Sequence, residues 1–113
     1  MVYLHGGGWV GGSIDGSDQL CRGITNAARA VVISVDYRLS PETKFPGALD
    51  DTMAALLWTR DAAAELNIDP DRIGVGGLSA GGNLAAAALV ARDRRALPIA
   101  FQLLIVPVAG PPL

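Results

Sequence analysis

The chain has 113 residues, with 14 Gly, 7 Pro, a single Cys and a single His; half of its residues are hydrophobic and 18% are charged. This composition excludes disordered, collagen-like and disulfide-stapled proteins, and a formal net charge of −2 without a basic patch argues against nucleic-acid binding. No apolar run reaches the roughly 20 residues that span a bilayer, and no secretory signal is visible, so we expect a cytoplasmic globular protein without a membrane span.

Short apolar segments alternate along the chain with segments long enough to hold a crossover helix. In chain order, the sequence predicts strands at 1–4, 30–36, 72–76 and 100–106 and helices at 15–29, 47–66 and 80–93. Because the strand segments lack polar alternation, we expect a parallel sheet that is covered on both faces. The fold class is therefore α/β, with about four parallel strands and crossover helices in one domain.

The predicted helices differ in how they should meet the sheet. In the helix 47–66, apolar side chains recur with helical spacing, which predicts one packing stripe. That stripe consists of Leu49, Met53, Leu56 and Leu57. Residues 84–90 are apolar nearly all round, so the last helix should be buried along most of its length. The lone Cys21 is expected to be a small buried hydrophobic residue.

The most informative motif is Gly77-Leu78-Ser79-Ala80-Gly81, which lies where the third predicted strand meets the third predicted helix. This context is typical of a nucleophile elbow, in which a serine occupies a strained turn between two small residues. Ser79 would lie at a helix N-terminus, whose free N–H groups favour developing negative charge. Taken alone, the pattern is equally compatible with a serine-capped glycine-rich turn or a phosphate-binding loop.

A second motif, His5-Gly6-Gly7-Gly8-Trp9, follows the first predicted strand. From this position a serine hydrolase lends backbone N–H groups to an oxyanion hole, and glycine lets the backbone approach the substrate oxygen. By itself the run would be a flexible turn, but beside the elbow it favours acyl transfer. Trp9 would either line an acyl pocket or pack beside the loop.

With a third motif, DYRLSPE at 36–42 followed by FPGALDD at 45–51, the chain resembles the hormone-sensitive lipase family of α/β-hydrolases, also called family IV of bacterial lipolytic enzymes. The elbow motif continues as GLSAGGNL over 77–84, and the resemblance extends over nearly the whole chain. It implies the spatial strand order second, first, third, fourth. It also implies hydrolysis of carboxylic esters, commonly with short acyl chains, without metal or organic cofactor.

The resemblance assigns roles to individual residues. Ser79 is the nucleophile, and the N–H groups of Gly7, Gly8 and Ala80 form the oxyanion hole. The supporting motif positions are His5, Gly6, Gly77 and Gly81. By the same resemblance, His5 braces the loop by hydrogen bonding and is not the catalytic base.

The sequence departs from the family pattern at three places. The family often has Asp at the position of Leu78, Ala at that of Ser40, and His-Pro at those of Thr43 and Lys44. None of these departures removes a reacting group. A carboxylate at the position of Leu78 would, however, alter the hydrogen bonds and the electric field beside Ser79.

In α/β-hydrolases, the catalytic acid and then the histidine follow the nucleophile along the chain. After Ser79 the sequence has one carboxylate, Asp93, near a predicted helix end, and no histidine. We therefore expect residues 1–113 to be a partial α/β-hydrolase domain, an internal fragment or truncated product without upstream cap and strands or downstream acid and histidine. Alone it should be inactive and expose two hydrophobic sheet edges.

Alternatives to an esterase remain open at this point. An amide or formamide hydrolase would use the same motifs, a receptor could retain the pocket to bind a small molecule without catalysis, and the chain could be a non-functional remnant. The expected partner is a small-molecule ester, with no nucleic acid and no metal, and self-association is left open.

Overall fold

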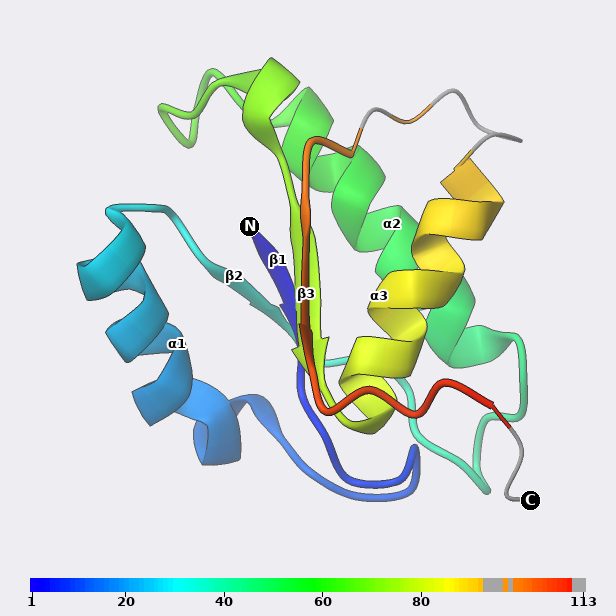
Figure 1. The fold of residues 1–113 in the computed structure, drawn as a ribbon. Helices are drawn as coiled ribbons and strands as arrows, with labels where there is room; N and C mark the ends of the chain where they lie inside the picture. Colours follow the sequence, from blue (N-terminus) through cyan, green and yellow to red (C-terminus); the bar gives the residue numbers. More distant parts are fainter. Residues whose placement is uncertain (93–96, 98, 111–113) are drawn as a thin grey trace.

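The computed structural model describes residues 1–92, 97 and 99–110, and strands alternate with helices along the chain (Figure 1). In chain order the elements are β1 (Val2–Leu4), α1 (Ile14–Ala28), β2 (Ile33–Val35), α2 (Gly47–Asp61), the 3₁₀ turn η1 (Pro70–Arg72), β3 (Val75–Leu78), α3 (Ala80–Ala91) and β4 (Gln102–Ile105). The strands are parallel and lie in the order β2-β1-β3-β4. The predicted α/β class and the strand order implied by the resemblance are confirmed.

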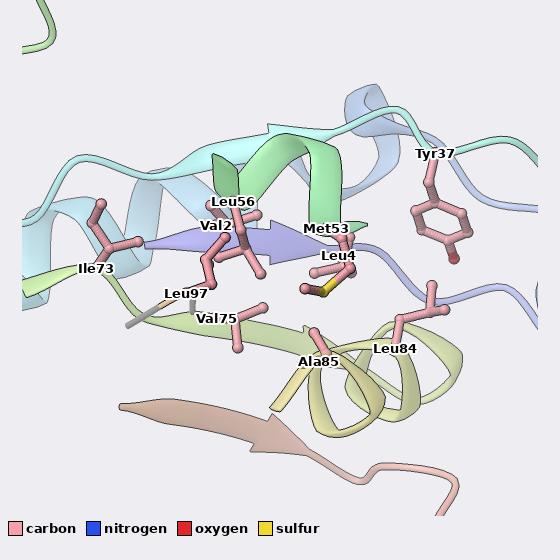
Figure 2. Close-up of a cluster of buried hydrophobic side chains, with 11 residues drawn as sticks. Val2, Leu4, Tyr37, Met53, Leu56, Ile73, Val75, Leu84, Ala85 and Leu97 are labelled. Atoms are coloured by element: carbon pink, nitrogen blue, oxygen red, sulfur yellow. The ribbon is translucent and has the colours of Figure 1, made fainter. Parts of the chain in front are cut away.

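Helices cover both faces of this sheet, with α1 on one face and α2 and α3 on the other (Figure 1). Because side chains alternate along β1, Val2 and Leu4 face the α2–α3 layer, whereas Tyr3 faces α1. The larger core lies on the α2–α3 side (Figure 2). It contains Val2, Leu4, Tyr37, Met53, Leu56, Ile73, Val75, Leu84, Ala85, Ala88 and Leu97.

A smaller buried cluster lies under α1. It consists of Met1, Tyr3 and Cys21, with Leu78 packed against it. The thiol of Cys21 is free and buried, which confirms its predicted hydrophobic role. Burial raises the pKa of this thiol, so it stays protonated at neutral pH.

The second helix is shorter than predicted. It ends at Asp61 instead of residue 66, and residues 62–67 form turns. At this end the N–H of Ala62 donates to the Arg60 carbonyl in addition to its ordinary helical bond to the Trp58 carbonyl, and the N–H of Ala63 also donates to the Arg60 carbonyl. These shorter-range bonds tighten the last turn and stop the helix, although its sequence has no glycine or proline there.

The buried face of α2 also differs from the predicted stripe. Met53 and Leu56 are buried as predicted, but so are Thr52 and Thr59, each with no exposed surface. Their hydroxyls donate to the carbonyls one helical turn back, at 2.8 Å and 2.7 Å. A threonine whose hydroxyl is satisfied within its own helix can pack as an apolar side chain, which hydrophobic periodicity does not register.

The strands are shorter than, or shifted from, the predicted ranges. Contrary to the expectation for the whole sheet, the outer strand β4 is not covered on both faces. Leu103 and Leu104 are 37% and 39% exposed. The third strand begins at Val75 because residues 70–72 form η1. The last helix is buried along most of its length as predicted, except for Val90 at 77% exposure. Its predicted end, with Asp93, lies outside the described residues.

The strand register brings three loops to one edge of the sheet. Leu4 at the end of β1 pairs with Val35 on β2 and with Gly77 on β3. The segments that leave these strands therefore start side by side. The first turn of α3 packs so closely on the end of β1 that a Cβ on Gly81 would lie 2.6 Å from the His5 carbonyl oxygen.

This contact predicts an asymmetry between two Gly→Ala substitutions. Gly81→Ala should lower the free energy of unfolding by about 3 kcal/mol, the upper part of the overpacking range, because the obstacle is backbone. A Cβ added at Gly23 in α1 would meet no atom within 4 Å. Gly23→Ala should therefore raise the free energy of unfolding by about 0.5–1 kcal/mol, since alanine loses less entropy than glycine when a helix forms. Urea unfolding of both variants measures the difference, and similar effects of the two substitutions would contradict it.

Candidate active site

Ser79 occupies the sharp turn between β3 and α3. Its backbone has φ 54° and ψ −113°, in the positive-φ region that non-glycine residues rarely adopt. The Ser79 N–H donates to the Ile105 carbonyl at 2.9 Å, and the Ser79 carbonyl accepts from the N–H groups of Asn83 and Val108. The predicted strained turn is therefore present, and hydrogen bonds to the end of β4 and to α3 hold it in place.

Gly77 is required by the same turn. A Cβ at this position would collide with the carbonyl group of Gly81 and would lie 2.7 Å from the Leu4 oxygen. Glycine therefore lets the last residues of β3 run between β1 and the helix that follows. Ala80, the first residue of α3, is fully buried. Its N–H belongs to the first helical turn, where the backbone donors have no partner within the helix.

The glycine-rich loop after β1 lies beside this turn. Gly7 and Gly8 have φ values of 132° and 63°, and the Gly7 carbonyl accepts from the N–H groups of Val10 and Gly11 at 3.2 Å and 2.9 Å. Among the described residues, no acceptor bonds to the N–H of Gly7 or Gly8. Gly6 approaches the elbow itself, since a Cβ there would lie 3.1 Å from the Leu78 carbonyl oxygen.

His5 is enclosed at the start of this loop. It is 2% exposed, and its Nδ1 lies 2.8 Å from the Gly6 carbonyl oxygen. Its ring stacks on that of Tyr37, with centroids 4.3 Å apart and an interplanar angle of 16°. The remaining ring nitrogen, Nε2, is buried without a partner among the described residues. The imidazole is therefore enclosed between the start of the loop and the ring of Tyr37.

Tyr37 is the residue at this site that the sequence reasoning missed. It appeared only as a letter in the third motif, yet its hydroxyl donates to the His5 carbonyl at 2.7 Å. Burial raises the pKa of Tyr37 to about 12, so the hydroxyl remains a donor at neutral pH. The available signal was the strand order, which places the segment after Val35 next to the segment after Leu4.

The loop that carries Tyr37 is fixed to α2 by an ion pair. Asp51 accepts hydrogen bonds from the Arg38 backbone N–H at 2.8 Å and from its Nη2 at 2.9 Å. Five charged residues in this region are candidates for tying down the loop: Asp36, Arg38, Glu42, Asp50 and Asp51. The structure confirms this for Arg38 and Asp51, and it gives the other three no ion pair with a described residue.

An apolar cavity of about 370 Å³ opens between the glycine-rich loop, α2 and α3. Its lining residues are Gly8, Trp9, Ser40, Thr43, Phe45, Ala48, Leu49, Asn83, Leu84 and Ala87. Trp9 lines this cavity and packs against the core, and its place in an acyl pocket stays a prediction. A second hollow, of about 400 Å³, lies on the α1 side of the elbow, lined in part by Leu78 and Ser79.

The position of Leu78, where the family often has aspartate, is apolar on the α1 side. Leu78 is half-buried and packs against the cluster of Met1, Tyr3 and Cys21. Within the described ranges, no group of three or more acidic, histidine or cysteine side chains is arranged to hold a metal ion. No helix among these residues is both long and apolar enough to cross a membrane.

Comparisons with known proteins agree with this geometry. A sequence profile of the alpha/beta hydrolase fold matches residues 1–112. Carboxylesterase NlhH of Mycobacterium tuberculosis is 51% identical over 108 residues, which cover 95% of this chain and 34% of the relative. The arylesterase of Saccharolobus solfataricus is 49% identical over 108 residues, which cover 95% of this chain and 35% of the relative.

Solved structures show the same likeness. An arylesterase structure superposes with a TM-score of 0.97 at 45% identity, covering 99% of this chain and 37% of that one. The structure of the thermostable carboxylesterase EstE1 from a metagenomic library gives a TM-score of 0.93 at 50% identity. The match covers 97% of this chain and 38% of that one. The chain thus spans about a third of the length of the relatives that it matches.

The ion pair between Arg38 and Asp51 predicts a pH-dependent stability. The Arg38 hydrogen bonds lower the pKa of Asp51 in the folded protein. The ion pair therefore stabilises the folded state fully at a pH above the unfolded pKa of Asp51, which is about 3.9. This stabilisation is lost as the pH falls through the lower pKa of the folded protein. Asp51→Asn should therefore lower stability at pH 7, and the loss should shrink toward pH 3. Urea unfolding across this range measures it.

Asp50→Asn provides the matched control, because it removes the same charge one residue away, from a side chain that makes no ion pair with a described residue. Its stability difference from the wild type should stay small at each pH. An Asp51→Asn loss that persisted unchanged at pH 3 would show that the carboxylate charge is not what fixes the loop.

Proposed function

The chain belongs to the alpha/beta hydrolase fold family, and on this premise we propose that it carries the nucleophile and oxyanion-binding loop of a serine carboxylesterase. One observation carries the proposal. Ser79 holds a positive-φ turn at the N-terminus of α3, and the glycine-rich loop leaves the neighbouring strand beside it. Similarity to carboxylesterases and arylesterases along nearly the whole chain supports the same assignment.

In the proposed reaction, the Ser79 Oγ attacks the carbonyl carbon of a small carboxylic ester. The hydroxyl proton passes to a base and then to the departing alcohol, which leaves an acyl group on Ser79. Water then attacks the acyl-enzyme, releases the carboxylic acid and restores the serine. Each addition step places negative charge on the substrate oxygen, so the surroundings of that oxygen set much of the barrier.

The oxyanion would be held by the backbone N–H groups of Gly7, Gly8 and Ala80. Two of these groups belong to glycines, which have no side chains, and neither bonds to a described acceptor. The third lies in the first turn of α3, where the helix dipole favours negative charge. Donors that are already oriented before the substrate arrives stabilise the transition state without reorganisation.

The base and its acid partner would come from outside residues 1–113. His5 is the only histidine in these residues, and its ring is buried in contacts with Gly6 and Tyr37. We therefore expect residues 1–113 alone to show little or no hydrolysis. The cavity lined by Trp9, Leu49 and Ala87 would receive the apolar part of the substrate, since its walls are mostly carbon and Gly8 is one of its lining residues.

The nucleophile is tested with a fluorophosphonate probe on the full-length protein that contains this chain. An activated Ser79 displaces fluoride and becomes phosphonylated, whereas Ser79→Ala should take up no probe and should lose about five to six orders of magnitude in kcat. Ser17 on α1 is half-buried and its hydroxyl donates to the backbone carbonyls of Ser13 and Ile14, so Ser17→Ala should label like the wild type. Labelling of Ser79→Ala would reject the assignment.

The same protein separates the alternative functions. Turnover of p-nitrophenyl acetate, with little turnover of p-nitroacetanilide, indicates an esterase, and the reverse preference indicates an amidase. Binding of a small ester without probe labelling would indicate a receptor. The absence of both binding and labelling would indicate a remnant without function.

The cavity predicts a determinant of acyl-chain length. Ala87→Leu adds three carbons to the wall that α3 contributes to the cavity. The ratio of kcat/KM for p-nitrophenyl hexanoate to kcat/KM for p-nitrophenyl acetate should therefore fall about tenfold. This is the effect expected when the pocket loses room for one or two methylene groups of the substrate. Val90→Leu, on the exposed side of the same helix, should leave the ratio unchanged. Equal ratios for wild type and Ala87→Leu would place the acyl group elsewhere.

A further inference from the structure

We propose that Tyr37 is a positioning residue for the oxyanion-binding loop, through which the segment after β2 fixes the backbone that leaves β1. The inference rests on the proposed function and extends it to a residue that does not touch the reacting atoms. Three features carry it: the hydrogen bond to the His5 carbonyl, the ring stack on the same residue, and a second backbone contact at the far end of the loop.

Tyr37 restrains both the backbone and the side chain of one residue. Its hydroxyl donates to the His5 carbonyl at 2.7 Å, while its ring stacks on the imidazole. Both residues are 2% exposed, so water does not compete for this hydrogen bond. The carbonyl of His5 belongs to the peptide group that leads into Gly6, so the hydrogen bond sets the direction in which the glycine-rich loop begins.

A second contact restrains the other end of the loop. The N–H of Ser40 donates to the Trp9 carbonyl at 2.8 Å. The segment 37–40 therefore holds the glycine-rich loop at His5, where it begins, and at Trp9, after its last glycine. Gly7 and Gly8, whose N–H groups are proposed to bind the oxyanion, lie between these two points.

The glycine-rich loop needs an external restraint of this kind. Gly7 and Gly8 have positive φ angles and no side chains that could pack. Within the loop, the backbone hydrogen bonds converge on the single carbonyl of Gly7. Since an oxyanion donor is effective only when it is already oriented, a loop with few contacts of its own depends on its neighbour for orientation.

The holding segment is itself fixed to the helical layer. Next to Tyr37, both the backbone N–H and the guanidinium of Arg38 bind Asp51 on α2. The ring of Tyr37 is part of the core shared by β1, α2 and α3 (Figure 2). The hydroxyl is therefore presented from a rigid base, which suits a positioning role.

Tyr37→Phe in the full-length protein tests the proposal, because it removes the hydroxyl and keeps the stacked ring. With enzyme concentration defined by fluorophosphonate titration, kcat should fall about tenfold while KM stays within about twofold. This loss is smaller than the hundredfold or more that removal of an oxyanion donor itself costs. Replacing Tyr37 with p-aminophenylalanine, which keeps an N–H donor at the same position, should restore most of the lost kcat.

Tyr3→Phe is the matched control. Tyr3 lies on β1 two residues before His5, it is fully buried, and its hydroxyl has no hydrogen-bond partner among the described residues. Loss of this hydroxyl should leave kcat and KM at their wild-type values. Equal falls in kcat for Tyr3→Phe and Tyr37→Phe would overturn the proposal, because the effect would then not depend on the contact with His5.

A Tyr37→Phe protein with lower thermal stability but wild-type kcat per titrated site would show a purely structural tyrosine and would also overturn the proposal. If Tyr37→Phe does not fold, the test uses Asp51→Asn, which releases the same segment from α2. A fall of about threefold or more in kcat at constant KM then supports the inference. An unchanged kcat rejects it. If the wild type itself takes up no probe, the proposed function has failed, and this result is distinct from a failure of Tyr37.

Discussion

The first turn of α3 lies directly against the backbone that leaves β1, and the candidate site depends on this contact. A Cβ on Gly81 would lie 2.6 Å from the His5 carbonyl oxygen, and one on Gly77 would lie 2.7 Å from the Leu4 oxygen. Two glycines therefore let a strand, a helix N-terminus and a loop converge within van der Waals distance. Any larger side chain at these positions would separate the serine turn from the loop beside it.

This convergence forces the turn into an unfavourable backbone conformation that its surroundings must maintain. Ser79 has φ 54°, a conformation that costs a non-glycine residue about 1–3 kcal/mol. Hydrogen bonds from β4 and α3 offset the cost, since the Ser79 N–H and carbonyl are both engaged. Strain at one residue is thus sustained by contacts from elements that follow it in the sequence, the nearer in α3 and the farther at and after the end of β4.

Local patterns predicted those parts of the fold that depend on neighbours in the sequence. The Gly-x-Ser-x-Gly motif between strand and helix predicted the strained turn at Ser79, and alternating strand and helix segments predicted the parallel sheet. The assignments of Gly7, Gly8 and Ala80 to an oxyanion hole stay predictions. Periodicity failed for Thr52 and Thr59, because it treats a hydroxyl as polar even when the preceding helical turn satisfies it.

The role of Tyr37 could not be read from local sequence, because it arises from contacts 32 residues apart that exist only after β2 pairs with β1. This dependence also explains how the site divides its tasks. Glycines that must present bare N–H groups have no side chains with which to hold themselves, so much of their orientation has to come from a neighbouring segment that is packed into the core. The parallel order β2-β1-β3 supplies that neighbour on one side of the loop and the serine turn on the other. A scaffold of three adjacent strands can therefore fix the proposed nucleophile and its proposed oxyanion donors together, whereas the proposed base, which must exchange protons, would come from outside residues 1–113.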